Sequence, residues 1–173
     1  MNGNYAVLLG LFVAALIIRN GYELLKKAGR VNPESKPLFA VIFAAMCLLW
    51  ASWFSMCPLD VARFEPSGLV RWIGFGAFVL GWLLAIGAII QLRGFESIDH
   101  LITTGLFSII RHPMYMGFIL WIVGWGLFHG ASLSLAAGLL GIGSILFWRR
   151  LEDKDLQARY GEQYRTYRKG TWF

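Results

Sequence analysis

Residues 113–148 read PMYMGFILWIVGWGLFHGASLSLAAGLLGIGSILFW, and His129 is the only Asp, Glu, Lys, Arg or His among them. A membrane-spanning helix takes about 20 apolar residues, so a stretch of this length is too long for one span. Near its middle, His129-Gly130-Ala131-Ser132 is typical of a tight turn. The stretch therefore predicts a helical hairpin, with helices from Met114 to Phe128 and from Ala131 to Trp148.

Three further apolar segments precede the hairpin: from Tyr5 to Ile18, from Leu38 to Leu59 and from Trp72 to Leu92. Hydrophobic residues make up 57% of the 173-residue chain and charged residues only 15%, against roughly 25% charged in a soluble domain. The first segment is short for a span, but no basic region precedes it as in a cleaved signal peptide, so we expect it to remain. The sequence predicts an all-α, polytopic integral membrane protein with five transmembrane helices in one domain, residues 1–173.

Lysine and arginine gather in alternate connecting segments. With five spans, 14 of the 16 basic residues fall on one side of the membrane, and Arg63 and Arg71 fall on the other. Cytoplasmic loops carry an excess of Lys and Arg, so we expect the N-terminus outside and the C-terminus in the cytosol. This bias explains the net charge of +6. No basic run interleaved with aromatic residues indicates nucleic-acid binding.

The two cysteines, Cys47 and Cys57, lie ten residues apart in one apolar segment. This spacing, without other ligands nearby, is not that of a disulfide framework or a metal site. We expect two buried apolar thiols. No other part of the sequence offers a ligand set for a metal, so none is expected.

Two charged segments flank the hairpin. One covers residues 99–117, ahead of its first helix, and the other begins at Arg149, after its second helix. Because the two helices are antiparallel neighbours, the start of the first and the end of the second must lie together at the cytosolic face. Residues 149–168 have the Leu and Tyr spacing of an amphipathic interfacial helix, which would lie against the bilayer or the protein body. We therefore expect the site in residues 93–173, after three N-terminal helices in residues 1–92.

The segment before the hairpin has residues suited to binding an anion. Pro113 suits the first turn of a helix, where its missing N–H leaves no bond unmade. The free N–H groups of that turn attract a carboxylate or phosphate, and Arg111 and His112 add donors just before it. The alternative is that both side chains are interfacial anchors among the lipid headgroups. Glu152, three residues after Arg149, could likewise form only a solvated surface ion pair.

One pattern in the C-terminal half resembles the isoprenylcysteine carboxyl methyltransferase family: Gly105-x5-Arg111-His112-Pro113-x-Tyr115-x-Gly117, followed by Glu152-Asp153-x-x-Leu156-x3-Tyr160-Gly161-x-x-Tyr164-x-x-Tyr167. Related membrane methyltransferases of phospholipids and small thiols share parts of it. The resemblance covers about residues 92–170, and the earlier helices match only in hydropathy. It implies S-adenosylmethionine as the cofactor, held in a cytosolic-side pocket of the C-terminal half, and S-adenosylhomocysteine as the product.

The resemblance also implies roles for individual positions. Methyl transfer would involve Arg149, Arg150 and Glu152. The cofactor pocket would be formed by His100, Leu101, Ile102, Gly105, Arg111, His112, Pro113, Tyr115 and Glu152. Family members usually hold an arginine four residues before the first acidic residue, where this chain has Trp148, and Arg149 or Arg150 is expected to replace it. Phe107 also replaces the usual tyrosine, and Asp153 replaces the second glutamate.

Methyl transfer from a sulfonium is an in-line displacement, to which an enzyme contributes positioning and a dry site. The resemblance implies a lipophilic acceptor that enters laterally from the lipid bilayer. A prenylcysteine-type carboxylate is the family's best-known case. A phospholipid amine or a small thiol on the same pocket is an alternative, and so is a non-catalytic membrane protein or transporter of the same fold.

Overall fold

A computed structural model describes residues 3–92 and 101–173 of the chain. Within these ranges the chain is helical, with two isolated β-bridges and no strand. The helices, of which η1 and η2 are short 3₁₀ helices, are α1 (Gly3–Lys27), α2 (Lys36–Met56), η1 (Cys57–Leu59), α3 (Gly68–Gln91), η2 (Gly105–Ser108), α4 (Pro113–His129) and α5 (Ser132–Gly170). The predicted all-α class is confirmed.

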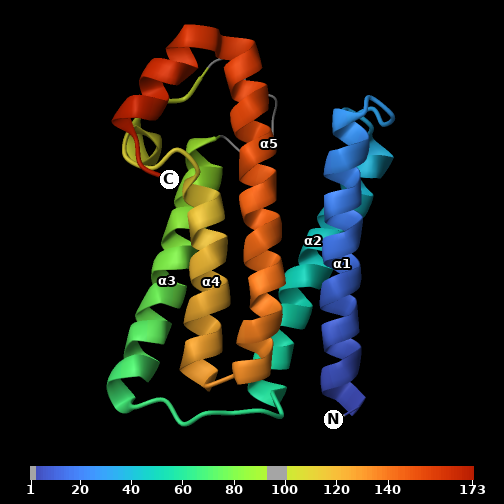
Figure 1. The fold of residues 1–173 in the computed structure, drawn as a ribbon, viewed down its shortest axis with the longest axis vertical. Helices are drawn as coiled ribbons and strands as arrows, with labels where there is room; N and C mark the ends of the chain where they lie inside the picture. Colours follow the sequence, from blue (N-terminus) through green and yellow to red (C-terminus); the bar gives the residue numbers. More distant parts are fainter. Residues whose placement is uncertain (1–2, 93–100) are drawn as a thin grey trace.

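The five long helices run alternately up and down the bundle (Figure 1). Helix α1 pairs with α2, α3 pairs with α4, and α5 packs on α4 and contacts α1. The end of α1, the start of α2, the end of α3, the start of α4 and the long extension of α5 therefore gather at one end. We call this the basic end, because Arg19, Lys26, Arg111 and Arg149 lie there.

The outer surface of the bundle is apolar. Four helices are long and apolar enough to cross a membrane: α1, α2 with η1, α3 and α5. Helix α4 is apolar but has only 17 residues, which is about 25 Å against a hydrocarbon core of about 30 Å. Ile17, Leu69 and Leu83 are 66%, 72% and 64% exposed, and surfaces of this kind are stable in lipid rather than in water. The helices form a multi-pass membrane bundle, and its orientation in the membrane stays a prediction.

The predicted turn between the last two apolar helices is confirmed at Gly130. Helix α4 ends at His129, and Gly130 is left-handed, with φ 62° and ψ 34°. Glycine is favoured at such a helix end because a Cβ would be strained there. On the next helix, the Ser134 amide donates to the Asp60 carboxylate at 2.6 Å. Asp60, from the α2–α3 loop, thereby caps the first turn of α5.

Helices α3 and α4 approach closely through paired glycines. A Cβ on Gly81 would lie 2.7 Å from the Gly117 carbonyl oxygen, and one on Gly117 would lie 2.6 Å from the Gly81 oxygen. Gly74 and Gly124 form a second pair of the same kind. Small residues let membrane helices approach until their backbones touch and gain van der Waals contact. The close contact places the start of α4 beside the end of α3, at the basic end.

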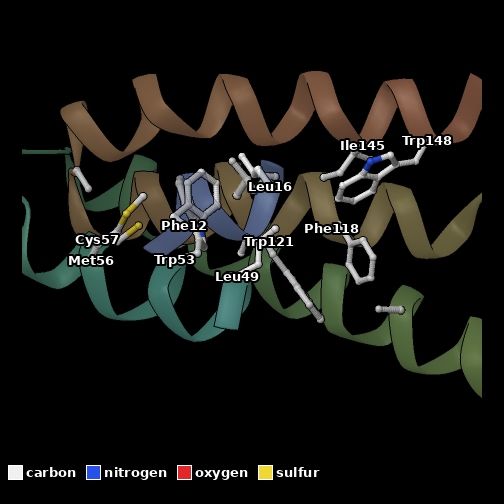
Figure 2. Packing of buried hydrophobic residues seen from close by; sticks show 14 of the residues in the cluster. Phe12, Leu16, Leu49, Trp53, Met56, Cys57, Phe118, Trp121, Ile145 and Trp148 are labelled. Atoms are coloured by element: carbon white, nitrogen blue, oxygen red, sulfur yellow. The ribbon is translucent and has the colours of Figure 1, made fainter. Parts of the chain in front are cut away.

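The core joins α1 and α2 to α4 and α5 through aromatic side chains. Phe12 of α1 packs on Trp53 of α2 with ring centroids 5.3 Å apart, and Trp50 of α2 meets Trp121 of α4 edge-on at 4.9 Å. Figure 2 shows Phe12 and Trp53 together near the middle of this cluster, with Trp148 of α5 toward one side. Aromatic pairs of this geometry contribute roughly 0.5–1.5 kcal/mol each beyond their burial.

Two expectations near the N-terminus differ from the structure. Helix α1 does not stop at Ile18 but continues to Lys27. Gly21 is accommodated within the helix, which Arg19 and Glu23 support with an ion pair one turn apart, and the chain leaves the helix before Gly29, whose φ is 66°. Of the two cysteines, Cys57 is buried as expected, but Cys47 is exposed. It lies on the outward face of α2, which sequence hydropathy alone does not distinguish from the inward face.

The helix expected over residues 149–168 is present, but its first part continues the last apolar helix and a kink separates its second part. Helix α5 continues beyond its apolar part, and at Gly161, with φ 53° and ψ −121°, the chain kinks. The segment after the kink then folds back over the ends of α3 and α4 (Figure 1). Tyr164 is fully buried, and the Tyr167 hydroxyl donates to the Phe107 carbonyl at 2.6 Å. The segment therefore lies against the protein body, the second of the two expected possibilities.

Candidate functional site

His112 is the centre of the candidate site. It is the residue before the first turn of α4, with Pro113 at the first helical position, and it is only 4% exposed. Its Nε2 lies 2.7 Å from Oδ1 of Asp153 on α5. The predicted convergence of the two charged segments is confirmed by this contact between residues 41 positions apart.

Asp153 is held as a buried carboxylate. Burial raises its pKa, but hydrogen bonds from His112 and from the Tyr164 hydroxyl outweigh burial and lower the pKa to about 2. An ionised carboxylate only accepts hydrogen bonds, so His112 donates through Nε2–H. In the neutral imidazole with its proton on Nε2, Nδ1 is the nitrogen that accepts. Asp153 and Tyr164 together fix the tautomer and orientation of His112.

Glu152 lies on the open side of the imidazole. Its Oε2 is 3.8 Å from Nδ1 of His112, and its side chain is 47% exposed. The Tyr115 hydroxyl interacts with the same carboxylate, and the Tyr115 ring stacks on the His112 ring at 5.6 Å. Two acceptors, Nδ1 and the Glu152 carboxylate, thus face each other beside an aromatic wall. A group that donates more than one hydrogen bond, such as an amine placed to one side of both atoms, could bond to the two acceptors.

Arg111 binds the C-terminal segment. Its NH1 group donates to the Thr171 carbonyl at 2.7 Å and to the Arg168 carbonyl at 3.2 Å. Backbone bonds between Trp172 and the residues beside Arg111 form a short parallel bridge. The Nε of Arg111 is buried and has no partner among the described residues. Arg111 therefore holds the C-terminal segment over the site and keeps one donor unused.

The remaining predicted cofactor residues lie around η2. Gly105 begins η2 with φ 57°, a backbone conformation that favours glycine, and a Cβ there would displace the end of the Gln91 side chain, 2.6 Å away. Gln91 of α3 holds the loop by accepting from the Leu106 amide at 3.0 Å. Leu101 and Ile102 are half-buried, and His100 lies outside the described residues. Among the described residues, Leu101, Ile102 and Gly105 have no hydrogen bond or ion pair with His112 or Glu152.

Arg149 and Arg150 are placed differently from each other. The Arg149 guanidinium lies over the Phe173 ring, 4.7 Å from its centroid, and Arg150 is exposed. The face of Trp148 is instead covered by Arg19 of α1, whose guanidinium carbon lies 4.8 Å from the ring centroid. The involvement of Arg149 and Arg150 in methyl transfer stays a prediction.

Helix α1 contributes polar residues that no motif indicated. The Trp148 indole N–H donates to the Asn20 side-chain oxygen at 2.7 Å, and the Asn20 amide donates to Ser144 at 2.9 Å. Arg19 forms an ion pair with Glu23, which is buried. In the sequence, these residues are marked only by the opposite charges of Arg19 and Glu23, four residues apart and directly after an apolar segment. Such pairs are common on solvated helices, so the signal is weak.

The helix amides and side chains around His112 provide both hydrogen-bond donors and acceptors for a zwitterionic ligand. The first turn of α4 has no side-chain cap in the described structure, so its amides remain free to bind a carboxylate. Glu152 and Nδ1 of His112 supply the acceptors. No group of three His, Cys, Asp or Glu side chains that could hold a metal occurs among residues 3–92 and 101–173.

Comparison with known proteins places this site in a family. The family model for phospholipid methyltransferase matches residues 69–163. This range is more than half of the chain and contains His112, Glu152 and Asp153. No solved structure gives a significant match.

Three relatives illustrate the range of named activities. Methanethiol S-methyltransferase 2 of Bradyrhizobium diazoefficiens is 28% identical over 145 residues, which cover 75% of this chain and 55% of that protein. Protein-S-isoprenylcysteine O-methyltransferase of Schizosaccharomyces pombe is 28% identical over 145 residues, which cover 71% of this chain and 59% of that protein. The chloroplastic 15-cis-zeta-carotene isomerase of Zea mays is 35% identical over 177 residues, which cover 95% of this chain and 48% of that protein.

The chain spans 48% to 59% of the length of these three relatives. Two of them carry methyltransferase names, in agreement with the resemblance that the sequence motifs indicated. The match over residues 69–163 includes both segments that meet at His112. The chain therefore belongs to the phospholipid methyltransferase family, and its relationship to the isoprenylcysteine-type membrane methyltransferases is confirmed.

Proposed function

We propose that this protein transfers a methyl group from S-adenosylmethionine to a lipophilic acceptor, at the cytosolic face of the membrane that holds it. The observation that carries the proposal is the meeting of His112 with Glu152 and Asp153 inside the region that the family model covers. The cytosolic side is inferred from the excess of Lys and Arg at the basic end.

The donors and acceptors of the site fit the methionine part of this cofactor. We assign its carboxylate to the free amides of α4 and to the unpartnered Nε of Arg111. We assign its amino group to Glu152 and Nδ1 of His112, and one wall to Tyr115. The cofactor supplies an electrophilic methyl group: an acceptor lone pair forms the new bond to carbon while the sulfur–carbon electron pair returns to sulfur.

For the acceptor we propose a prenylcysteine-type carboxylate. A carboxylate is already ionised at neutral pH, so the reaction needs no base. An apolar prenyl chain can reach the basic end laterally from lipid, because apolar side chains near that end of α1 and α3, Leu24 and Ile90, are exposed. The relative from Schizosaccharomyces pombe carries the corresponding name.

A small thiol is the second candidate acceptor, and one relative is named a methanethiol S-methyltransferase. A thiol has to lose its proton before it attacks. For this acceptor the cofactor amino group would be held by Glu152 alone, and Nδ1 of a neutral His112, whose Nε2–H donates to Asp153, would accept the thiol proton. Methylation of a thiol with no methylation of a prenylcysteine would favour this candidate.

Isothermal titration of detergent-purified protein with S-adenosylhomocysteine tests the proposal. We expect binding by the wild-type protein, and His112→Ala should weaken it about tenfold or more, about 1.4 kcal/mol. Lys154→Ala, an exposed neighbour on α5, is the control and should bind normally. Glu152→Gln should impair cofactor binding or turnover while the protein still folds. No measurable binding by the wild type would overturn the proposal and leave a non-catalytic role.

A further inference from the structure

Arg19 is a half-buried charged residue that packs on Trp148 of α5, four residues before Glu152. It is the first charged residue after the apolar stretch of α1, and its side chain is 14% exposed. Burying a guanidinium next to lipid is costly, so such residues in membrane proteins commonly serve a site. Glu23, one turn later and 11% exposed, neutralises it through a hydrogen-bonded ion pair.

The Arg19 guanidinium lies over helix α5 on the face that carries Glu152. Its central carbon is 4.8 Å from the Trp148 ring centroid. Trp148 and Glu152 are four residues apart on one helix, so they share a face and are neighbours. Tyr115 is within electrostatic range of Arg19 as well as of Glu152. Arg19 of α1 and Glu152 of α5 therefore lie toward the same face of α5, on the side of Tyr115 of α4.

The position of Arg19 is fixed by its neighbours. Asn20 bonds both Trp148 and Ser144, which sets the register between α1 and α5. The guanidinium also lies over the Tyr22 ring at 5.4 Å. Only NH1 of Arg19 has an acceptor among the described residues, the Glu23 carboxylate. The Trp148 and Tyr22 rings hold the guanidinium in position, and its other N–H groups have no acceptor among the described residues.

Space for a ligand group exists next to the ion pair. A cavity of about 210 Å³ between α1 and α5 is lined by Glu23, Lys26, Lys27, Leu151 and Asp155. Its lining includes Glu23, which neutralises Arg19, and Leu151, the residue before Glu152 in the sequence. A ligand group bound in this cavity would therefore lie beside the carboxylate that holds Arg19.

We propose that Arg19 binds the anionic group of the methyl acceptor and so selects a carboxylate acceptor over a neutral or amine one. The inference rests on the proposed function and names the acceptor class of that same site. A guanidinium binds a carboxylate through two parallel hydrogen bonds, and an ammonium acceptor would be repelled by it. Glu23 competes for the guanidinium in the free protein and is displaced, wholly or in part, when the acceptor binds.

The competition with Glu23 gives two variants with opposite expected effects. Arg19→Gln removes the binding group and should weaken binding of a carboxylate acceptor. Glu23→Gln removes the competing carboxylate and should strengthen it. If the ion pair were only structural, both variants would change stability in the same direction, and neither would change acceptor affinity. Arg30→Gln, an exposed arginine after α1, controls for the loss of one positive charge.

The test is binding of N-acetyl-S-farnesylcysteine to the full chain in the presence of saturating S-adenosylhomocysteine, so that no reaction occurs. Its carboxamide analogue is the neutral probe. We expect Arg19→Gln to weaken carboxylate binding about tenfold or more, since a charge-assisted bidentate pair is lost. Binding of the carboxamide should change less than about twofold, and Glu23→Gln should tighten carboxylate binding.

Binding of S-adenosylhomocysteine separates failure of this inference from failure of the proposed function. If the wild type does not bind it, the proposed methyltransferase function fails. If the wild type and Arg19→Gln both bind it and also bind the carboxylate probe equally, only the role of Arg19 is overturned. Equal weakening of the carboxylate and carboxamide probes would also overturn it, because the effect would not depend on the negative charge.

Discussion

The Nε2 atom of His112 at the start of α4 lies 2.7 Å from Oδ1 of Asp153 on the extension of α5. Both side chains are buried, and the Tyr164 hydroxyl donates to the same oxygen. Glu152, the neighbouring acidic residue, keeps its carboxylate at the surface of the site. The two adjacent acidic residues therefore have different tasks: Asp153 orients the imidazole, and Glu152 remains free to bind a ligand.

Asp153→Asn should destabilise the protein. The substitution removes a charged acceptor of two buried hydrogen bonds, and hydrogen bonds to charged groups contribute roughly 1.5–3 kcal/mol each. We expect a loss of about 2–3 kcal/mol, since the neutral amide keeps part of the bonding. Thermal unfolding in detergent measures the effect. Asp155→Asn, an exposed acidic residue on the same helix, should unfold as the wild type does, and equal stability of both variants would contradict the assigned role.

The stability contributed by Asp153 should depend on pH. Its pKa is lowered to about 2 in the folded protein, against about 3.9 in an unfolded chain. The contribution is therefore fully present above about pH 4 and is lost as the pH falls toward 2, and it amounts to roughly 2 kcal/mol. Unfolding of the wild type and of Asp153→Asn at pH 6 and pH 2.5 checks this. The difference in stability between them should shrink at the lower pH, and a constant difference would exclude the ionised carboxylate as its source.

Gly81→Ala should weaken the contact between α3 and α4. The added Cβ would lie 2.7 Å from the Gly117 carbonyl oxygen, and backbone cannot yield without moving the helix. Overpacking of this kind costs about 1–3 kcal/mol. Gly76→Ala, where nothing lies within 4 Å of the added Cβ, is the matched control and should be neutral or stabilising because alanine favours helix. Comparable melting temperatures for the two variants would argue against close helix packing at Gly81.

Asp60→Ala should destabilise the start of α5. The carboxylate accepts the Ser134 amide at 2.6 Å and the Ala62 amide at 2.8 Å, and it is 5% exposed. Loss of such a cap costs about 0.5–2 kcal/mol. Hydrogen exchange should show faster exchange at the Ser134 amide, with little change at the basic end of α5. Glu65→Ala, an exposed acidic residue in the same loop, should leave that exchange unchanged.

Arg111→Gln should loosen the C-terminal segment. NH1 of Arg111 holds the carbonyls of Arg168 and Thr171, and glutamine is too short to reach both. The backbone bond from Trp172 N–H to the Ile109 carbonyl, 2.8 Å long, should then exchange faster with solvent. Mass spectrometry of the exchanged protein would detect this. Unchanged protection of Trp172 would show that the backbone bridge alone holds the segment.

The hairpin and the convergence of its flanking segments could be predicted from the sequence because both depend on local properties. A 36-residue apolar stretch with a turn at Gly130 can only fold back on itself in a bilayer. Antiparallel helices joined by a short turn then bring residues near Pro113 beside residues near Glu152. The helix count and the all-α class follow from hydropathy in the same way.

The partners within the site were decided by tertiary structure. Adjacent residues on a helix point about 100° apart, so the rotation of α5 against α4 determines that Asp153, not Glu152, meets Nε2 of His112. The packing of α1 on α5 places Arg19 over Trp148, 129 positions along the chain. The turn at Gly161 returns Tyr164 to Asp153. Hydropathy determines which segments are buried in lipid, and only packing between helices determines which side chains face each other.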